Sequence, residues 1–387
     1  MYNHVARSSG PVVQRRIDAL GIGQRMQDLP EELWHESFRY YVKEDSTRRG
    51  GPNLRMIRLD PSKPSLTVTG YAFNKFVHPH ADRFITVREA ARLQGFPDDL
   101  EFMGSLTSMQ QQVGNAVPVE MSSAIFSHLL ANASKNGQSK KLNALSLFSG
   151  AGGLDIGAQR SKHDGHCIEV PLAIDNWKDA CDTLSNYAGP RTTVRQQDIS
   201  KIDDPSEYWR DATRLSRGPD VVFGGPPCQA FSQAGKQKAL CDPRGELIFE
   251  FVRFVSDLSP SYFVMENVPN LASVDNGGLL KQIMRSMQDC GYNVSTGVLC
   301  AADYGTAQLR KRRVFVGCRG HLGSVGMPPI TRCPSSNLYG LPGYRTVGDA
   351  FRGLPLVAEG GKREERSIRA AEAKPEEPAL ATAPDSA

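Results

Sequence analysis

The sequence predicts an α/β fold with a mostly parallel sheet. Four short apolar runs are typical of buried strands, and they occupy residues 144–148, 170–175, 220–225 and 261–268. Between the last two runs, Leu247–Leu258 is amphipathic with the spacing of a helix. Strands that alternate with helices in this way favour a parallel sheet.

The composition is ordinary for a globular protein, with 387 residues of which 40% are hydrophobic and 23% charged. This length suggests two or three domains. A net charge of +4 permits a nucleic-acid partner without indicating one. We find neither an apolar stretch near the ~18 residues of a membrane span nor a secretory signal pattern. Because the eight cysteines include no C-x-x-C pair, we expect a cytoplasmic protein with free thiols.

The segments that flank the predicted sheet are less regular. Helical spacing occurs at Val87–Gln94, which stops at the sequence GFP, and again at Met121–Leu130. Residues 132–143 are small, polar and basic, which is typical of a linker. Residues 359–387 contain only two large apolar side chains, Ile368 and Leu380, so we expect a disordered tail there.

A glycine-rich segment, LFSGAGGL at 147–154, ends the first predicted strand and opens a helix. Glycines allow the backbone to approach a ligand, and the helix N-terminus offers free N–H groups. Asp175 ends the second strand, where a carboxylate usually binds a ribose hydroxyl pair, and Asp198 follows the next strand candidate, where it could meet an adenine edge. These features favour a nucleotide-like cofactor but do not separate NAD from S-adenosylmethionine. The alternative is a tight turn with two solvated acids.

The most distinctive segment is FGGPPCQAFS at 223–232, which places Cys228 on a Pro-Pro loop directly after a buried strand. Proline fixes the backbone there, and ligand sites of open sheets lie at such strand ends. A buried structural thiol is the alternative for any cysteine, and we expect it for the other seven. For Cys228 a reactive role is favoured.

Further polar residues follow the next strands. Glu266 ends a very apolar run, and a carboxylate there can have a raised pKa and donate a proton. Gln308, Arg310 and Arg312 alternate along the chain and so can converge on one site. The alternatives are a capping or ion-paired Glu266 and a basic run that is solvated or contacts phosphates.

This set of side chains fits one reaction. Carbon 5 of cytosine does not attack a methyl sulfonium unaided, but a thiolate that adds to C6 turns the ring into a nucleophilic enamine. A neutral carboxylic acid helps by protonating N3, and arginines lower the thiol pKa and hold the base and the acid. The base must leave the duplex to reach such a pocket. We identify no base for the later removal of the C5 proton, and water could serve.

Over residues 60–319 the chain resembles the bacterial cytosine-C5 DNA methyltransferases of restriction–modification systems. The resemblance depends on the succession of motifs rather than on any one of them: LFSGAGG, AID, GGPPCQAFS, DPRGELIFE, MENV and QLRKRR. It implies a Rossmann-like S-adenosylmethionine-dependent methyltransferase fold with a small target-recognition domain.

The resemblance also implies roles for individual residues. The catalytic group would be Cys228 as nucleophile, Glu266 as the N3 partner, and Arg310 and Arg312 in support. S-adenosylmethionine would be held by Phe148, Gly150, Gly152, Gly153, Asp175, Asp198, Pro227, Leu247, Asn115 and Val117. DNA would meet Gln229, Ser232 and Gln308. Independently of the resemblance, Arg48 and Arg49 are candidate phosphate contacts, with a solvated loop as the alternative. No metal is expected, because His78 and His80 beside Asp82 provide too few ligands and the family needs none.

The order of the motifs departs from the usual arrangement of the family. The equivalents of its two last motifs come first here, at residues 83–97 and 112–118, which implies a circular permutation. Permutation would divide the target-recognition region between the two ends of the sequence. The predicted division is 1–58 and 320–358 for target recognition, 59–131 for the permuted motifs that complete the catalytic domain, 132–143 for the linker, 144–319 for the cofactor-binding catalytic domain, and 359–387 for the tail.

The expected partner is double-stranded DNA. We expect the protein to be a monomer that associates with the nucleoid and protects DNA from a cognate restriction endonuclease. Three alternatives stay open. The protein could act on RNA, since some relatives of this motif set act on transfer RNA, or it could be a DNA-binding regulator with a decayed site. An NAD-dependent oxidoreductase would share the glycine loop but has no use for Cys228. The sequence does not give the DNA site that is recognised.

Overall fold

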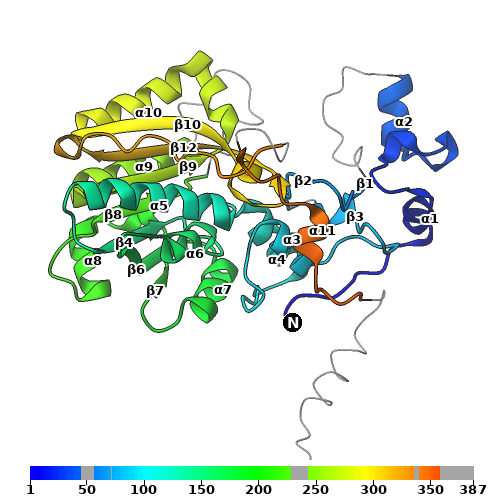
Figure 1. Ribbon diagram of the computed structural model, residues 1–387, viewed down its shortest axis with the longest axis horizontal. Coiled ribbons are helices and arrows are strands. Elements are labelled where there is room, and N and C mark those ends of the chain that lie inside the picture. The colour runs from blue at the N-terminus through cyan, green and yellow to red at the C-terminus, as the bar shows by residue number, and fades with distance from the viewer. Residues whose placement is uncertain (45–55, 71, 228–242, 335–339, 358–387) are drawn as a thin grey trace, which may run out of the picture.

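The computed structural model describes residues 1–44, 56–70, 72–227, 243–334 and 340–357 (Figure 1). The main sheet of these residues has the strand order β10-β12-β9-β8-β4-β6-β5, and β7 also pairs with β6. Its strands are β4 (Lys141–Leu147), β5 (Lys162–His163), β6 (His166–Asp175), β7 (Thr193–Gln196), β8 (Val221–Gly224), β9 (Tyr262–Asn267), β10 (Tyr292–Cys300) and β12 (Lys311–Arg319).

The centre of this sheet is parallel, because β9, β8, β4, β6 and β7 each pair in parallel with the next. Both edges depart from this pattern: β12 lies antiparallel between β9 and β10, and β5 pairs antiparallel with β6. The four apolar runs correspond to β4, β6, β8 and β9, so the predicted α/β fold is confirmed. Along β8, Val221 and Phe223 face one hydrophobic core and Val222 faces the other, as the two-residue period of a strand requires.

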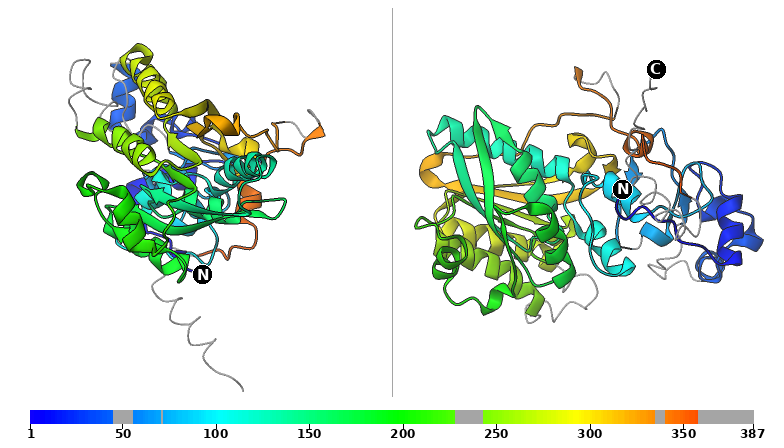
Figure 2. Two further views of the ribbon diagram at one scale, coloured as in Figure 1. Left: turned by 90° about the vertical axis from the view of Figure 1, so that its left-hand side faces the viewer. Right: turned by 90° about the horizontal axis from the view of Figure 1, so that it is seen from below.

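Helices cover both faces of the sheet (Figure 2). Side chains of α5 and α6 belong to one core, and side chains of α8, α9 and α10 belong to the other, while α7 packs on β7. These helices are α5 (Val119–Lys135), α6 (Gly153–Arg160), α7 (Lys178–Ala188), α8 (Pro205–Thr213), α9 (Pro243–Leu258) and α10 (Gly278–Asp289). None of the helices in the described residues is long and apolar enough to cross a membrane.

The linker predicted at 132–143 is wrong in its bounds. Helix α5 continues to Lys135, and β4 begins at Lys141, so only residues 136–140 connect them. The polar composition suggested a linker, but polar residues of this segment lie within the helix and make tertiary contacts. Asn132 Nδ2, for example, donates to the carbonyl oxygens of Leu322 (3.3 Å) and Ser324 (3.2 Å). The helices predicted at 87–94 and 121–130 are confirmed as α3 (Val87–Leu93) and α5.

The residues before α5 form a smaller lobe beside the sheet (Figure 1). Besides α3, it contains α1 (Pro11–Ala19), α2 (Glu36–Lys43), α4 (Leu106–Asn115), β1 (Ile57–Arg58), β2 (Ser65–Leu66) and β3 (Phe76–Val77). Strand β2 connects the lobe to the larger part of the molecule, because it pairs in parallel with β11 (Gln308–Leu309), which directly precedes β12 of the main sheet.

The described stretches nearest the two ends of the chain meet at α3. The ring Nε2 of His4 lies 2.8 Å from the carbonyl oxygen of Pro355. Arg88 N donates to Asn3 O at 3.0 Å, and Arg83 Nε donates to Val357 O at 3.0 Å. Nearby, α11 (Val347–Phe351) packs on α3. Segments from the two predicted recognition pieces are therefore neighbours, although the division into domains stays a prediction.

Candidate active site

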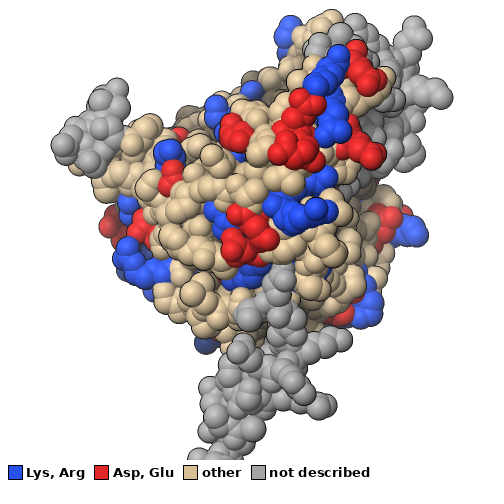
Figure 3. Space-filling view, turned by 90° about the vertical axis from the view of Figure 1, so that its right-hand side faces the viewer, with Lys and Arg blue, Asp and Glu red and all other residues tan. Residues whose placement is uncertain are grey.

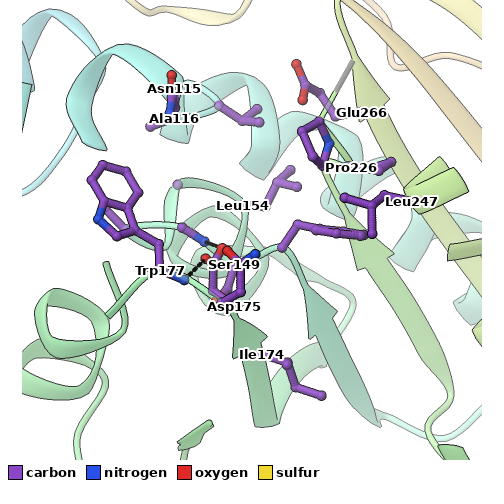
Figure 4. A pocket seen from close by; sticks show the side chains of 18 of the residues that line it. Asn115, Ala116, Ser149, Leu154, Ile174, Asp175, Trp177, Pro226, Leu247 and Glu266 are labelled. Atoms are coloured by element: carbon purple, nitrogen blue, oxygen red, sulfur yellow. Dashed lines mark hydrogen bonds between the residues drawn. The ribbon is translucent and has the colours of Figure 1, made fainter. Parts of the chain in front are cut away.

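A cavity of about 360 Å³ opens at the carboxyl ends of the parallel strands (Figure 4). Ligand sites of open α/β sheets occupy this edge. Its walls come from the segments after β4, β6, β8 and β9 and from the turn that follows α4. The cavity thus brings together segments predicted to bind the cofactor with Glu266 and Arg312, which were predicted to be catalytic. Of the predicted residues it is lined by Asn115, Val117, Phe148, Gly150, Gly153, Asp175, Asp198, Pro227, Leu247, Glu266 and Arg312.

The glycine loop forms one wall by adopting a backbone that other residues resist. Gly150 and Gly152 have φ of 53° and 86°, and Phe148 itself is left-handed at 53°. Gly152, which is not among the lining residues, is the N-cap of α6. A Cβ on Gly153 would stand 2.3 Å from the carbonyl oxygen of Val117. Glycine is therefore required at 153 for the turn after α4 to reach the pocket.

The carboxyl group of Asp175 binds the main chain of the glycine loop. One carboxyl oxygen accepts a hydrogen bond from Gly150 N and the other accepts one from Trp177 N, each at 2.8 Å. Burial raises the pKa of Asp175, and the bonds from the amides of Trp177 and Gly150 oppose that shift. Asp198 lies in the same cavity, and its Oδ1 accepts bonds from Ser200 N (3.0 Å) and Ser200 Oγ (2.7 Å).

Trp177 is a lining residue that the sequence reasoning missed. Its indole stands on one side of the cavity, and Leu247 and Pro226 stand on the other (Figure 4). A flat ring opposite aliphatic side chains forms a slot suited to a heteroaromatic ring. An aromatic residue two positions after a strand-end acid is the signal that could have found it.

Glu266 is the penultimate residue of β9 and lies at the opposite side of the cavity, with 8% of its surface exposed. Its Oε1 lies 2.6 Å from Arg312 Nε, which makes a nearly buried ion pair. Burial raises the pKa of Glu266, and the charges of Arg312 and Arg310 oppose that rise. The net direction favours the protonated acid more than in water, as the prediction of a proton donor requires.

Asn267 connects this acid to the Pro-Pro loop. Its Nδ2 donates to the carbonyl oxygen of Pro226 at 3.1 Å, and its Oδ1 accepts from Val268 N at 2.8 Å. Asn267 is 3% exposed, so both bonds are shielded from water. The main chain two residues before Cys228 is therefore fixed next to Glu266.

A model of the family described as C-5 cytosine-specific DNA methylase matches residues 13–131 and 142–339. The chain belongs to this methylase family. The enzyme class predicted from the sequence, a DNA cytosine-5 methyltransferase, is thereby confirmed at the level of the family.

Individual relatives agree with this assignment. Over 233 residues the chain is 38% identical to Type II methyltransferase M.AquIA of Picosynechococcus sp., covering 56% of this chain and 89% of the relative. Over 222 residues it is 39% identical to Type II methyltransferase M1.HphI of Haemophilus parahaemolyticus, covering 57% of this chain and 54% of the relative. The chain therefore spans most of the first relative and about half of the second.

A solved structure of a prophage-encoded E. coli protein, described there as a DNA modification methyltransferase, is also similar. The match has 30% sequence identity and a TM-score of 0.44, and it covers 56% of each chain.

Two residues of the methylase's QLRKRR motif do not reach the cavity. Arg310 is fully buried and donates to Val68 O (2.7 Å) and Gly114 O (2.9 Å), so its contacts are with main-chain carbonyls rather than with the cavity. Its supporting role in catalysis stays a prediction. Gln308 is also fully buried, and its amide group bonds only to protein atoms. The predicted DNA contact by Gln308 is wrong, because the lobe before α5 covers the face that this motif presents.

Some predicted residues of the methylase lie outside the described residues: Cys228, Gln229, Ser232, Arg48, Arg49 and the tail at 359–387.

On the described surface at the end of the small lobe, basic and acidic side chains are interspersed (Figure 3). For example, Glu31 Oε1 forms ion pairs with Lys43 Nζ at 2.5 Å and with Arg39 Nε at 3.8 Å.

In the described residues no cluster of three or more His, Cys, Asp or Glu forms a metal site. His78 instead stacks on Phe351.

Proposed function

We propose that this protein is a DNA (cytosine-5-)-methyltransferase that transfers a methyl group from S-adenosylmethionine to C5 of a flipped cytosine in a specific duplex sequence. One observation carries the proposal. The cavity that begins at the glycine loop ends at a buried Glu266, which is paired with Arg312 and stands beside a Pro-Pro loop that leads directly to Cys228.

The cavity fits S-adenosylmethionine. Close contact of Gly153 with the carbonyl of Val117 leaves a narrow wall of backbone, and the first turn of α6 offers free N–H groups for the carboxylate of the methionine part. Asp175 occupies the place of a ribose partner, and the slot between Trp177 and Leu247 suits the adenine ring. When bound, this cofactor supplies an electrophilic methyl group.

The residues of the chain prepare the cytosine. The Cys228 thiolate forms a bond to C6 while Glu266 gives its proton to N3, so the ring becomes an enamine with electron density at C5. Arg312 holds the Glu266 carboxyl in place and stabilises the negative charge left after proton transfer. After methylation, water takes the C5 proton, and the C5–H electron pair forms the C5=C6 double bond as the C6–S bond breaks with its electron pair returning to sulfur. N3 then returns its proton to Glu266, and product is released.

We further propose that the motif order is circularly permuted relative to the usual family arrangement. The bonds of His4 to Pro355 and of Arg83 to Val357 support this, because they bring together the segments that the usual order would join. The two recognition pieces would then form one surface from both ends of the sequence.

Rejoining the chain tests the permutation. A variant opened between residues 136 and 140, with residue 357 joined to residue 1 by a short Gly-Ser linker, is expected to fold and to bind S-adenosylmethionine as tightly as wild type. Circular dichroism and isothermal titration calorimetry would measure this. A chain that cannot fold in that order, while the same linker is tolerated at the C-terminus of the original chain, would contradict the proposal.

The substrate proposed is double-stranded DNA, and the Type II names of the relatives support a role in a restriction–modification pair. A cognate endonuclease, a monomeric state and association with the nucleoid are parts of the same proposal. The fully buried Arg310 and the Glu266–Arg312 pair argue against a decayed site, since all the described catalytic partners remain in place.

Methyl transfer from tritiated S-adenosylmethionine is the decisive test. We expect label in C5 of cytosine when unmethylated duplex DNA of varied sequence is supplied, and none when the same sites are already methylated. Transfer RNA assayed in parallel should stay unlabelled. Label in RNA alone would replace DNA by RNA as the substrate, and label in neither would contradict the proposed activity.

A further inference from the structure

Two buried glutamine side chains, Gln94 and Gln308, are hydrogen-bonded to each other. Gln94 follows α3 of the small lobe, and Gln308 begins β11. Gln308 Nε2 donates to Gln94 Oε1 at 2.9 Å and to Leu93 O at 3.1 Å, while Gln308 Oε1 accepts from Val68 N at 2.7 Å. Both side chains are fully buried, and neither lines the cavity. We call these two residues the glutamine pair.

The glutamine pair contacts the turn at residues 113–117, which comprises the last three residues of α4 and the two residues that follow it. Gln94 Nε2 donates to the carbonyl oxygen of Val113 at 2.8 Å. Arg310, two residues after Gln308, donates to the next carbonyl oxygen, that of Gly114, at 2.9 Å. The side chains of Gln94 and Arg310 thus hold two successive carbonyl groups of this turn. Gln94 is in turn bonded to Gln308 in β11, and Arg310 lies just after β11.

The turn has little room to move. A Cβ on Gly114 would stand 2.1 Å from Gly70 N, and a Cβ on Gly153 would stand 2.3 Å from Val117 O. The turn is therefore wedged between two segments of backbone. Because Asn115, Ala116 and Val117 line the cavity, a shift of the turn changes the shape of the cavity wall.

We propose that Gln94 and Gln308 are positioning residues for S-adenosylmethionine: through the turn at 113–117 they align the cofactor wall with the Glu266–Arg312 pair without touching the cofactor. The inference rests on the proposed function. Apolar side chains would also fill this space, but only directional bonds fix the carbonyls of the turn, and a buried amide left without its partner is strongly disfavoured.

A double-mutant cycle tests the inference. Gln94→Met and Gln308→Met remove the amides at similar volume, and calorimetry measures the dissociation constant for S-adenosylmethionine without DNA. We expect each single variant to bind about tenfold more weakly and the double variant to be no weaker than the worse single, because both break one network. The rate at saturating cofactor should change less than about threefold, as for lost ground-state binding.

A charge-bearing variant covers the case in which a Met variant does not fold. Gln94→Glu keeps an acceptor for Gln308 but turns a second oxygen toward Val113 O. Protonation restores a donor there, so affinity for S-adenosylmethionine is expected to recover toward that of wild type as the pH falls. A merely structural role would give no such recovery.

Asn132→Leu is the matched control, because Asn132 also holds main-chain carbonyls but at residues 322 and 324, away from the cavity. It should lower the melting temperature and leave the affinity for the cofactor unchanged. The inference is overturned by wild-type affinity in the Met variants, by multiplicative effects in the double variant, or by equal weakening in Asn132→Leu. Wild-type protein that binds no S-adenosylmethionine would overturn the proposed function, and this inference with it.

Discussion

A Cys228→Ser variant is expected to lose methyl transfer by about four orders of magnitude or more, the range reported when a covalent nucleophile is removed from other enzymes. The serine hydroxyl has a far higher pKa than a thiol and is not ionised near neutral pH, so no adduct forms at C6. The variant should keep its affinity for S-adenosylmethionine, because the cavity walls described above come from other residues. Tritium transfer and calorimetry measure the two quantities.

DNA that carries 5-fluorocytosine identifies the nucleophile directly. Fluorine at C5 cannot leave as a proton does, so the C6–S bond persists and a covalent complex accumulates. Wild type is expected to form this complex in denaturing gels and Cys228→Ser is not. A trapped complex with the serine variant would assign the attack to another residue, and Cys181→Ser, at a buried thiol remote in sequence from the Pro-Pro loop, is the matched control.

A Glu266→Gln variant should have the second largest effect, a loss of about 10² to 10⁴ in the rate at saturating substrates, which is the usual contribution of a positioned acid. The amide keeps the shape of the side chain but has no acidic proton to give to N3. Cofactor affinity and melting temperature serve as controls for folding. A variant that retains most of the rate would remove Glu266 from the mechanism.

The pH dependence gives an independent reading of the same group. Glu266 must be protonated to act, so the rate should fall as the pH rises through its pKa. Burial raises that pKa, which moves this alkaline limb above the position of an ordinary glutamate. Arg312 opposes the rise, so Arg312→Leu is expected to move the limb further toward alkaline pH in whatever activity remains. A limb that does not shift would assign it to a different group.

The main sheet could be predicted because its central strands are apolar on both faces. Strand β8, for example, has all four residues buried, and such a run has few other structural explanations. Strand β10 was not predicted, because it lies at the edge of the sheet and its residues alternate weakly. The antiparallel insertion of β12 likewise depends on pairing partners that are far apart in the sequence.

The site shows the same division between local and tertiary information. The glycine loop, Asp175 and Glu266 were predictable because each follows directly from the end of a strand. The alternation of Gln308, Arg310 and Arg312 predicted that all three converge on one site, and the structure does not bring them together in the cavity. Only Arg312 reaches the cavity, since the lobe before α5 covers the other two. Sequence periodicity identifies a face and not what packs on it.

The glutamine pair also has a consequence for how the protein is made. Gln94 and Gln308 are 214 residues apart, and Val68 and Arg310 are 242 apart. At the usual ~5–20 residues per second of synthesis, the small lobe waits on the order of 10 to 40 s on the ribosome for its partners. During that interval its future buried amides and carbonyls are solvated and its apolar residues are unpaired. Under the proposed permutation, the usual motif order would place these residues last, where they would meet a finished sheet. We therefore expect the small lobe of this chain to stay incompletely packed for longer during synthesis.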